Sequence, residues 1–199
     1  MAKDIGNSLQ VTIGSSLPTY QVTANDIVPV TGCYDIFNIS NPSTSTVALI
    51  PTRIFASMDA TAASTMDIYL VRRTAANSGG TAVAISYGVA TSALTGTVGF
   101  IPHDTSDQAS VALVNAYSAN PTYGTGITIE SGRLTVPAAA TPTVPLVNWE
   151  MIWNNRGSKP LVIRPGQYLA PSFGGQATPA GASMYLTIEW IEVPLISLF

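Results

Sequence analysis

The chain is short of charged residues. They make up 10% of its 199 residues, whereas ordinary soluble domains carry roughly 25%. Serine and threonine outnumber them and can hydrate a surface without charge. An isolated small domain stays soluble more easily with about 25–35% of its surface charged. We therefore expect other subunits to cover much of this surface; a monomer with a Thr/Ser-rich β surface is the alternative.

Cysteine and histidine each occur once. A lone Cys33 excludes an intrachain disulfide and a cysteine-based zinc site, and its place in a predicted strand indicates a buried thiol rather than a nucleophile. A lone His103 excludes the cluster of histidines that holds the metal of cupin-like enzymes. We interpret His103 as a turn residue, and its neighbours Asp104 and Asp107 lack the spacing of a calcium loop.

Basic residues are also few. The net charge is −3, and the eight lysines and arginines form no stripe that could follow a phosphate backbone, so we expect no direct nucleic-acid binding. No glycine-rich phosphate loop is present, and the sequence predicts no cofactor. The first ten residues lack a signal-peptide core, and the apolar end "VPLISLF" is too short to span a bilayer. We expect synthesis in the cytoplasm and no membrane segment.

Alternating apolar and polar residues recur along the chain, and amphipathic helical patterns are scarce. This pattern predicts an all-β protein, an antiparallel β-sandwich or jelly roll. The segment 106–117 is ambiguous between helix and strand. Strands are expected at 9–14, 19–23, 33–40, 46–57, 65–73, 81–88, 132–136, 147–154, 160–164 and 183–193.

Three parts are expected along the chain. Residues 1–31 form an N-terminal arm or an added outer strand, 32–193 form the sandwich, and 194–199 form a short apolar tail. Such a tail must dock on its own sandwich or on a neighbouring subunit, and the sequence leaves both open. The candidate interface residues of the tail are Pro194, Leu195, Ile196, Leu198 and Phe199.

The stretch "LVIRPGQYLA", residues 161–170, contains a Pro-Gly turn. Pro165 fixes its own φ and favours an extended residue before it, while Gly166 can take a positive φ, which together predict a type II turn. Because tight hairpins prefer types I′ and II′, we expect this turn to redirect the chain from one sheet to the other rather than to close a two-residue hairpin. Arg164 and Gln167 are candidates for a polar contact there, with a neighbouring subunit or with solvent.

Aromatic and acidic residues near the ends of strands offer no clear catalytic pattern. Glu189 and Glu192 lie three apart on a predicted strand, so they point to opposite faces and cannot act as a glycosidase pair. The tryptophans share parity with apolar neighbours, which favours core packing over a sugar-binding platform. Tyr117 and Tyr123 lie nearer to loops and could serve an interface. The tryptophans are Trp149, Trp153 and Trp190.

Five segments in series carry a resemblance to a known family. They resemble the jelly-roll-type structural proteins encoded by tailed bacteriophages, over about residues 47–193. The segments are "DIYLVRRTAANSGGT" (67–81), "IPHDTSDQASVALVNAYSANPTYGTG" (101–126), "SGRLTVPAA" (131–139), "LVIRPGQYLA" (161–170) and "PAGASMYLTIEWIE" (179–192).

The resemblance implies a part of the virion and carries over no catalytic residue. With the low charge and the apolar tail, it predicts a capsid decoration or cement protein, a homotrimer that binds the phage major capsid protein. The alternative is a tail, baseplate or fibre component of the same fold, serving as an assembly joint or binding host glycans. A cupin-like or glycosidase-like enzyme is a third hypothesis, which the single histidine and the separated carboxylates disfavour.

Overall fold

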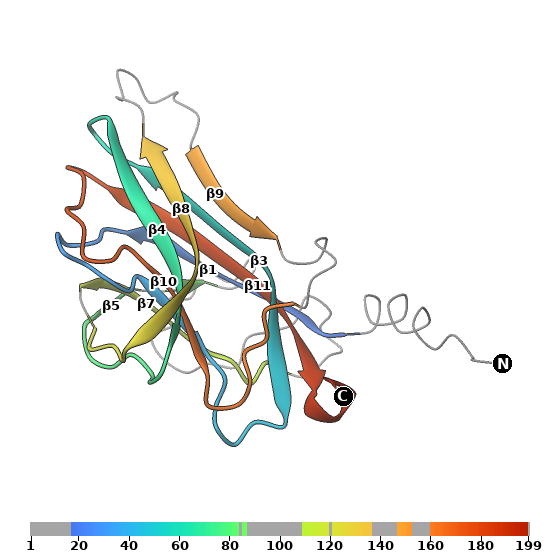
Figure 1. Ribbon diagram of the computed structural model, residues 1–199. Helices are drawn as coiled ribbons and strands as arrows, with labels where there is room; N and C mark the ends of the chain where they lie inside the picture. The colour runs from blue at the N-terminus through green and yellow to red at the C-terminus, as the bar shows by residue number, and fades with distance from the viewer. Residues whose placement is uncertain are drawn as a thin grey trace.

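Figure 1 shows the computed structural model, a β-sandwich of two antiparallel sheets. The structure describes residues 17–83, 85–86, 109–119, 121–136, 147–152 and 160–198. Within them, a five-stranded sheet has the order β6-β1-β11-β3-β9, formed by Ile85–Ser86, Thr19–Ile27, Ser183–Pro194, Val47–Asp59 and Val147–Ile152. A six-stranded sheet has the order β5-β7-β2-β10-β4-β8, formed by Thr81–Val83, Leu113–Ala119, Phe37–Ser40, Tyr168–Ser172, Ser64–Arg73 and Gly126–Val136. The predicted all-β antiparallel sandwich is confirmed.

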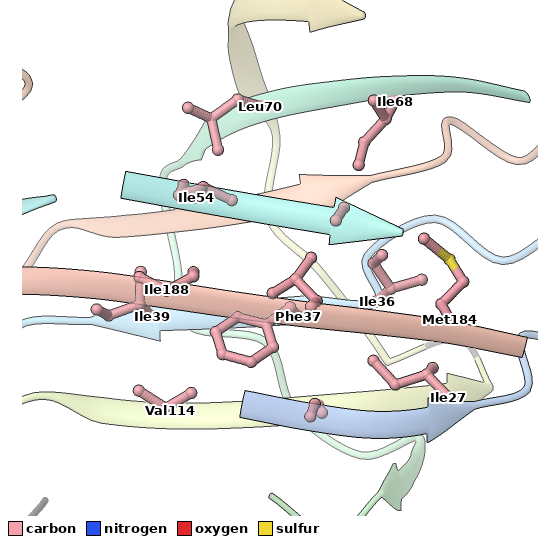
Figure 2. Close-up of a cluster of buried hydrophobic side chains, with 14 of the residues drawn as sticks. Ile27, Ile36, Phe37, Ile39, Ile54, Ile68, Leu70, Val114, Met184 and Ile188 are labelled. Carbon is pink, nitrogen blue, oxygen red and sulfur yellow. The ribbon is translucent and has the colours of Figure 1, made fainter. Parts of the chain in front are cut away.

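The core lies between the sheets, and the alternation seen in the sequence produces it. On β11, Met184, Leu186, Ile188 and Trp190 are buried, while the residues between them are partly exposed. Figure 2 shows apolar side chains from both sheets meeting, among them Ile54 and Ile188 from the five-stranded sheet and Phe37, Ile68 and Leu70 from the six-stranded sheet. Period-two patterning therefore decides which face of each strand is buried.

The position of β1 differs from the prediction that residues 1–31 form an arm or an added outer strand. It adds a strand to the five-stranded sheet, as one alternative allowed, but it pairs on both sides, with β11 and with β6. Its buried side chains belong to the same core cluster as those of the later strands; they are Tyr20, Val22, Ala24 and Ile27. Residues 19–27 are therefore part of the sandwich. The predicted strand 9–14 lies outside the described residues.

Two further segments show how tertiary contacts decide local structure. The ambiguous segment 106–117 contributes to β7, so its valine-rich part forms a strand. The prediction of a strand at 160–164 is wrong: Ile163 forms a single bridge with Leu49, and the next strand, β10, begins at Tyr168. The chain turns at Pro165–Gly166 before a second ladder pair can form.

One side of the sandwich is closed by a short crossing segment. The strands β5 and β6 are separated by one residue, yet β5 pairs with β7 of the six-stranded sheet and β6 pairs with β1 of the five-stranded sheet. The chain thus passes directly from the edge of one sheet to the edge of the other. At the opposite side the outermost described strands are β8 and β9 (Figure 1).

Candidate functional site

The Pro-Gly turn of "LVIRPGQYLA" is the corner that joins the two sheets. Gly166 has a φ of 75°, and the Gln167 N–H donates to the Arg164 carbonyl at 2.9 Å, as the type II turn requires. Ile163 pairs with Leu49 on β3 of the five-stranded sheet, whereas β10 lies in the six-stranded sheet. The prediction that this turn carries the chain from one sheet to the other is confirmed.

Asn41 holds this corner from inside, a role that no motif of the sequence predicts. Its side-chain amide donates to the carbonyls of Val47 at 2.8 Å and Ile163 at 3.0 Å, and its side chain is buried. Its backbone exchanges hydrogen bonds with Gly166 and Gln167. One asparagine thereby satisfies a carbonyl at the start of β3 and one in the segment before the turn, and it holds the turn in place.

Arg164 and Gln167, the predicted contact residues, have different roles at this corner. The Gln167 side chain accepts a hydrogen bond from the Arg164 N–H at 2.9 Å, so its oxygen is used within the turn. The Arg164 side chain is exposed at the surface. Of the two, Arg164 is better placed to meet another molecule.

The apolar C-terminal tail docks in part on its own sandwich. Pro194 ends β11, and Leu195–Leu198 form a 3₁₀ turn whose Leu195 N–H donates to the Thr46 carbonyl at 3.1 Å. Leu195 is half-buried, but Ile196 is 87% exposed. Phe199 and the side chain of Leu198 lie outside the described residues. The tail is thus anchored through its backbone and presents an isoleucine outward.

Other large apolar side chains are exposed on the sandwich. Ile127 on β8 is 75% exposed, which is unusual for an isoleucine in a strand. The others lie in three separate segments, in the loop before β2, before β7 and on β8; they are Val28, Val30, Tyr34, Val111 and Ile129. Each of these side chains leaves apolar area uncovered on a chain with little charge.

A buried ion pair ties the loops at one end of the six-stranded sheet. Asp35 is fully buried and accepts hydrogen bonds from the Arg73 guanidinium through both oxygens, one of them from Nε at 3.0 Å. Asn77 donates to the same carboxylate at 2.9 Å. Arg73 also donates to the Gly124 carbonyl at 3.3 Å, and its guanidinium lies 4.5 Å from the centre of the Tyr123 ring.

This cluster was missed by sequence reasoning because its members are far apart in the chain. Tyr34 packs against the Tyr123 ring of this cluster, with 4.9 Å between the two ring centres. Burial raises the pKa of Tyr123, and the neighbouring Tyr34 raises it further. Tyr117, also considered for an interface, is buried, and burial followed by the charge of Asp35 raises its pKa. Because its hydrogen bonds join separate loops, we interpret this cluster as a structural one that stabilises their packing.

Cys33 is a buried thiol, as predicted. It is 1% exposed, and burial followed by the Asp35 charge raises its pKa from 9.0 to about 11. A protonated buried thiol is a poor nucleophile. Its immediate surroundings therefore fit core packing rather than covalent chemistry.

The raised pKa of Cys33 predicts a pH-dependent stability. Between pH 9 and about 11 the unfolded thiol ionises while the folded thiol keeps its proton, so the free energy of unfolding should fall as the pH rises through this window. Urea unfolding at pH 8 and pH 10.5, compared with the Cys33→Ala variant, measures this contribution. The variant should lose less stability than the wild type over the same interval; an equal loss in both would contradict the assignment.

The two C-terminal carboxylates lie on opposite faces, as expected. Glu189 is partly exposed and lies 3.6 Å from Arg53. Glu192 is buried and accepts hydrogen bonds from the Ser110 hydroxyl, from the Val111 N–H at 3.0 Å and from Trp190 Nε1 at 3.5 Å. It fastens the segment before β7 to β11. The separation rules out joint action on one glycosidic bond.

The structure tests the prediction for one tryptophan, Trp190, and leaves those for the other tryptophans and for His103 untested. Trp190 is fully buried and stacks on Tyr20 at a centroid distance of 5.7 Å, which confirms its core role. The side chains of Trp149 and Trp153 lie outside what the structure describes, as do His103, Asp104 and Asp107. Among the described residues, no three His, Cys, Asp or Glu side chains come together as a possible metal site.

A hollow on the outer face of the six-stranded sheet was also not foreseen. It has a volume of about 410 Å³ and lies over β4 and β8. In the ladder, Asp67 pairs with Arg133 and Tyr69 with Ser131, while Met66, Ile68 and Leu134 turn to the core. The residues that line the hollow are Asp67, Tyr69, Ser131, Gly132 and Arg133. Because they come from two strands separated by some sixty residues, only the pairing of β4 with β8 could have revealed them.

Comparison of the chain with protein-family models, curated proteins and solved structures gave no match. Within the described ranges, no helix has the length and apolar character needed to cross a membrane.

Proposed function

We propose that this protein is a structural component of a tailed-phage virion, a capsid decoration or cement protein that binds the coat lattice. The observation that carries the proposal is the set of exposed apolar side chains, Ile196 and Ile127 above all, on a sandwich whose core is already filled. Covering apolar area on a partner contributes about 25 cal/mol per Å². Many such contacts repeated on a lattice add up through multivalency. The proposed role is binding and assembly, without a catalytic reaction.

The order of the strands supports a jelly roll for this fold. Setting aside β5, β6 and β7, the remaining strands form two groups of four, β1-β11-β3-β9 and β2-β10-β4-β8. Along the chain the strands alternate between the groups except at the step from β4 to β8, which lie side by side. Two interleaved Greek keys of this kind are typical of jelly rolls, including those of viral capsids. On this interpretation, β5–β7 belong to an insertion at the one connection that stays within a sheet.

The proposed partner is the major capsid protein, and the proposed assembly state is a homotrimer in the virion. Imaging of purified particles by electron cryomicroscopy, with the copy number measured by quantitative mass spectrometry, tests the location. Hundreds of copies on the capsid surface are expected. A protein absent from the particle, or confined to its tail, would end the capsid assignment. The native mass of the free protein, measured by light scattering, tests the trimer separately.

A second candidate function is a tail, baseplate or fibre component that acts as an assembly joint or binds host glycans. The hollow over β4 and β8 favours it, because an aromatic ring beside paired polar side chains suits a small polar ligand. Copy number separates the two: a few to some tens of copies per virion would favour the tail.

Removal of Leu195–Phe199 should weaken incorporation into the virion more than it weakens the fold. Ile196 is largely exposed, and the hydrogen bond from the Leu195 N–H of this turn to the Thr46 carbonyl is worth about 1 kcal/mol. Urea unfolding and the amount of protein on purified particles are measured for the truncated chain and for Ile196→Ser. Equal losses in both measurements would contradict a docking role for the tail.

A further inference from the structure

The hollow over β4 and β8 is built from side chains that are held in place by the loop after β10. The Gln176 amide binds the backbone of Asp67 on both sides, accepting from its N–H and donating to its carbonyl, each at 3.1 Å. The same amide nitrogen donates to the Phe173 carbonyl at 2.8 Å. Gln176 thus continues the ladder beyond the last residue of β10, and Asp67 is fixed at the rim of the hollow.

Tyr69 is positioned by the same loop. Gly174, with a φ of 64°, lies so close to the Tyr69 ring that an added Cβ would come within 3.0 Å of Cε2. Glycine is therefore needed both for the left-handed backbone and for the approach to the ring. Tyr69 remains partly exposed, so the ring is held at the surface without being buried.

The charged residues of the hollow form a neutral pair with spare hydrogen-bonding capacity. Arg133 Nε donates to Asp67 at 2.8 Å, and this bond, with the charge of Asp67, raises the pKa of Arg133. Their side chains are 67% and 34% exposed. Asp67 is the one hydrogen-bond partner of the Arg133 side chain within the described part of the chain. Within these described residues, the terminal nitrogens of the guanidinium and the second carboxylate oxygen make no hydrogen bond, so they keep their capacity to bond a ligand.

We propose that this hollow binds a pyranose sugar. A sugar ring presents apolar C–H groups on one face and neighbouring hydroxyls that both donate and accept along its edge. Tyr69 supplies an aromatic surface for the C–H face. Asp67 accepts from hydroxyls and Arg133 donates to them. The volume of about 410 Å³ lies in the range of small-ligand sites.

The pairing of the charges selects against the simplest rival, an inorganic anion. A phosphate or sulfate site gathers unopposed cationic groups or backbone N–H donors. Among the described residues that line the hollow, Arg133 carries the one guanidinium. Asp67 accepts its hydrogen bond, and the negative charge of Asp67 repels an anion. A neutral polyol gains from both members of the pair. This inference does not depend on where in a virion the protein lies.

Titration of the ¹⁵N-labelled full chain with single sugars tests the proposal by NMR. The probes are glucose, galactose, mannose and N-acetylglucosamine, each up to tens of millimolar, with inorganic phosphate as the rival. At least one sugar is expected to shift the amides of Ser131 and Gly132 and the Arg133 Nε–H saturably. Saturable shifts by phosphate alone, or by none of the probes, would overturn the proposal.

Variants distinguish binding in the hollow from unspecific contact. Tyr69→Ala should weaken sugar binding at least tenfold, whereas Tyr69→Phe keeps the ring and should stay within threefold of the wild type. Arg133→Ala, at an exposed position, keeps the test valid if Tyr69→Ala fails to fold, and should also weaken binding at least tenfold. Tyr185→Ala, on β11 of the other sheet, is the matched control and should bind like the wild type. Unchanged affinity in Tyr69→Ala or Arg133→Ala would place the sugar elsewhere and refute the site.

Discussion

Replacement of Arg73 by methionine is expected to lower the free energy of unfolding by about 3–5 kcal/mol, the usual cost of removing one partner of a buried ion pair. Asp35 is fully buried, and its carboxylate is bonded by the Arg73 guanidinium and the Asn77 amide. Without Arg73, the carboxylate keeps only neutral donors in a site closed to water. Its charge is then poorly compensated, and the folded state loses stability.

The exposed pair Asp67–Arg133 provides a matched control for this change. It joins the same two residue types at 2.8 Å, but the Arg133 side chain is 67% exposed. Arg133→Met should cost at most about 1 kcal/mol, because water screens a surface pair. Urea unfolding followed by circular dichroism compares the two variants. A similar cost for both would show that the burial of Asp35 is not what makes its pair strong.

A double-mutant cycle locates the cost in the pair itself. With Asp35→Asn added to Arg73→Met, the carboxylate charge is gone, and the double variant should be less destabilised than the sum of the single variants by about 0.5–3 kcal/mol. Additive effects would contradict the pairing. Arg73→Lys should not restore full stability, because an ammonium cannot reproduce the two-pronged contact with Asp35 or the stacking on Tyr123.

Replacement of Trp190 by alanine is expected to destabilise the fold by about 3–5 kcal/mol, as for other large buried aromatic residues. Trp190 is fully buried on β11, opposite Tyr20 on β1, and the two rings stack with an angle of 20° between their planes. The change leaves a cavity between β1 and the core and removes the Nε1 donor that lies 3.5 Å from Glu192. The losses of buried apolar area, of ring stacking and of one hydrogen-bond donor all lower the free energy of unfolding.

Two further variants separate the contribution of the ring from that of the position in the chain. Trp190→Phe keeps a ring opposite Tyr20 and should cost clearly less than Trp190→Ala. Ile196→Ala, at an exposed position near the end of the same segment, should stay within about 0.5 kcal/mol of the wild type. Unfolding is followed by far-ultraviolet circular dichroism, because the tryptophan signal itself changes. A cost below about 1 kcal/mol for Trp190→Ala would contradict the packing of this strand.

Several features follow directly from the sequence because they depend on neighbours in the chain. Strand alternation predicts the buried face of β11 and the opposite orientations of Glu189 and Glu192. The Pro-Gly pair predicts the turn at residues 164–167. The predicted strand at 33–40 indicates the burial of Cys33, which is confirmed although β2 begins only at Phe37. In each case the deciding physics, strand parity, backbone dihedrals or local hydrophobicity, acts over a few residues.

In other segments, the local sequence preference predicts the wrong structure because distant strands decide it. Residues 160–164 have the apolar residues of a strand, but the turn at Pro165 and the Asn41 amide leave only one bridge, at Ile163. Residues 19–27 look like an appendage in the sequence, yet they pair with strands from residues 85–86 and 183–194. Partners that arrive from distant parts of the chain decide these outcomes, and no local pattern encodes them.

By itself, the sequence determined an all-β chain, the parity of its strands and one corner turn. Only the tertiary structure brought Asp35 to Arg73 across 38 residues and Asp67 to Arg133 across 66 residues. The reason is physical: parity and turn geometry are local properties of the backbone, whereas an ion pair or a hollow exists only once the ladders have set which strands lie side by side.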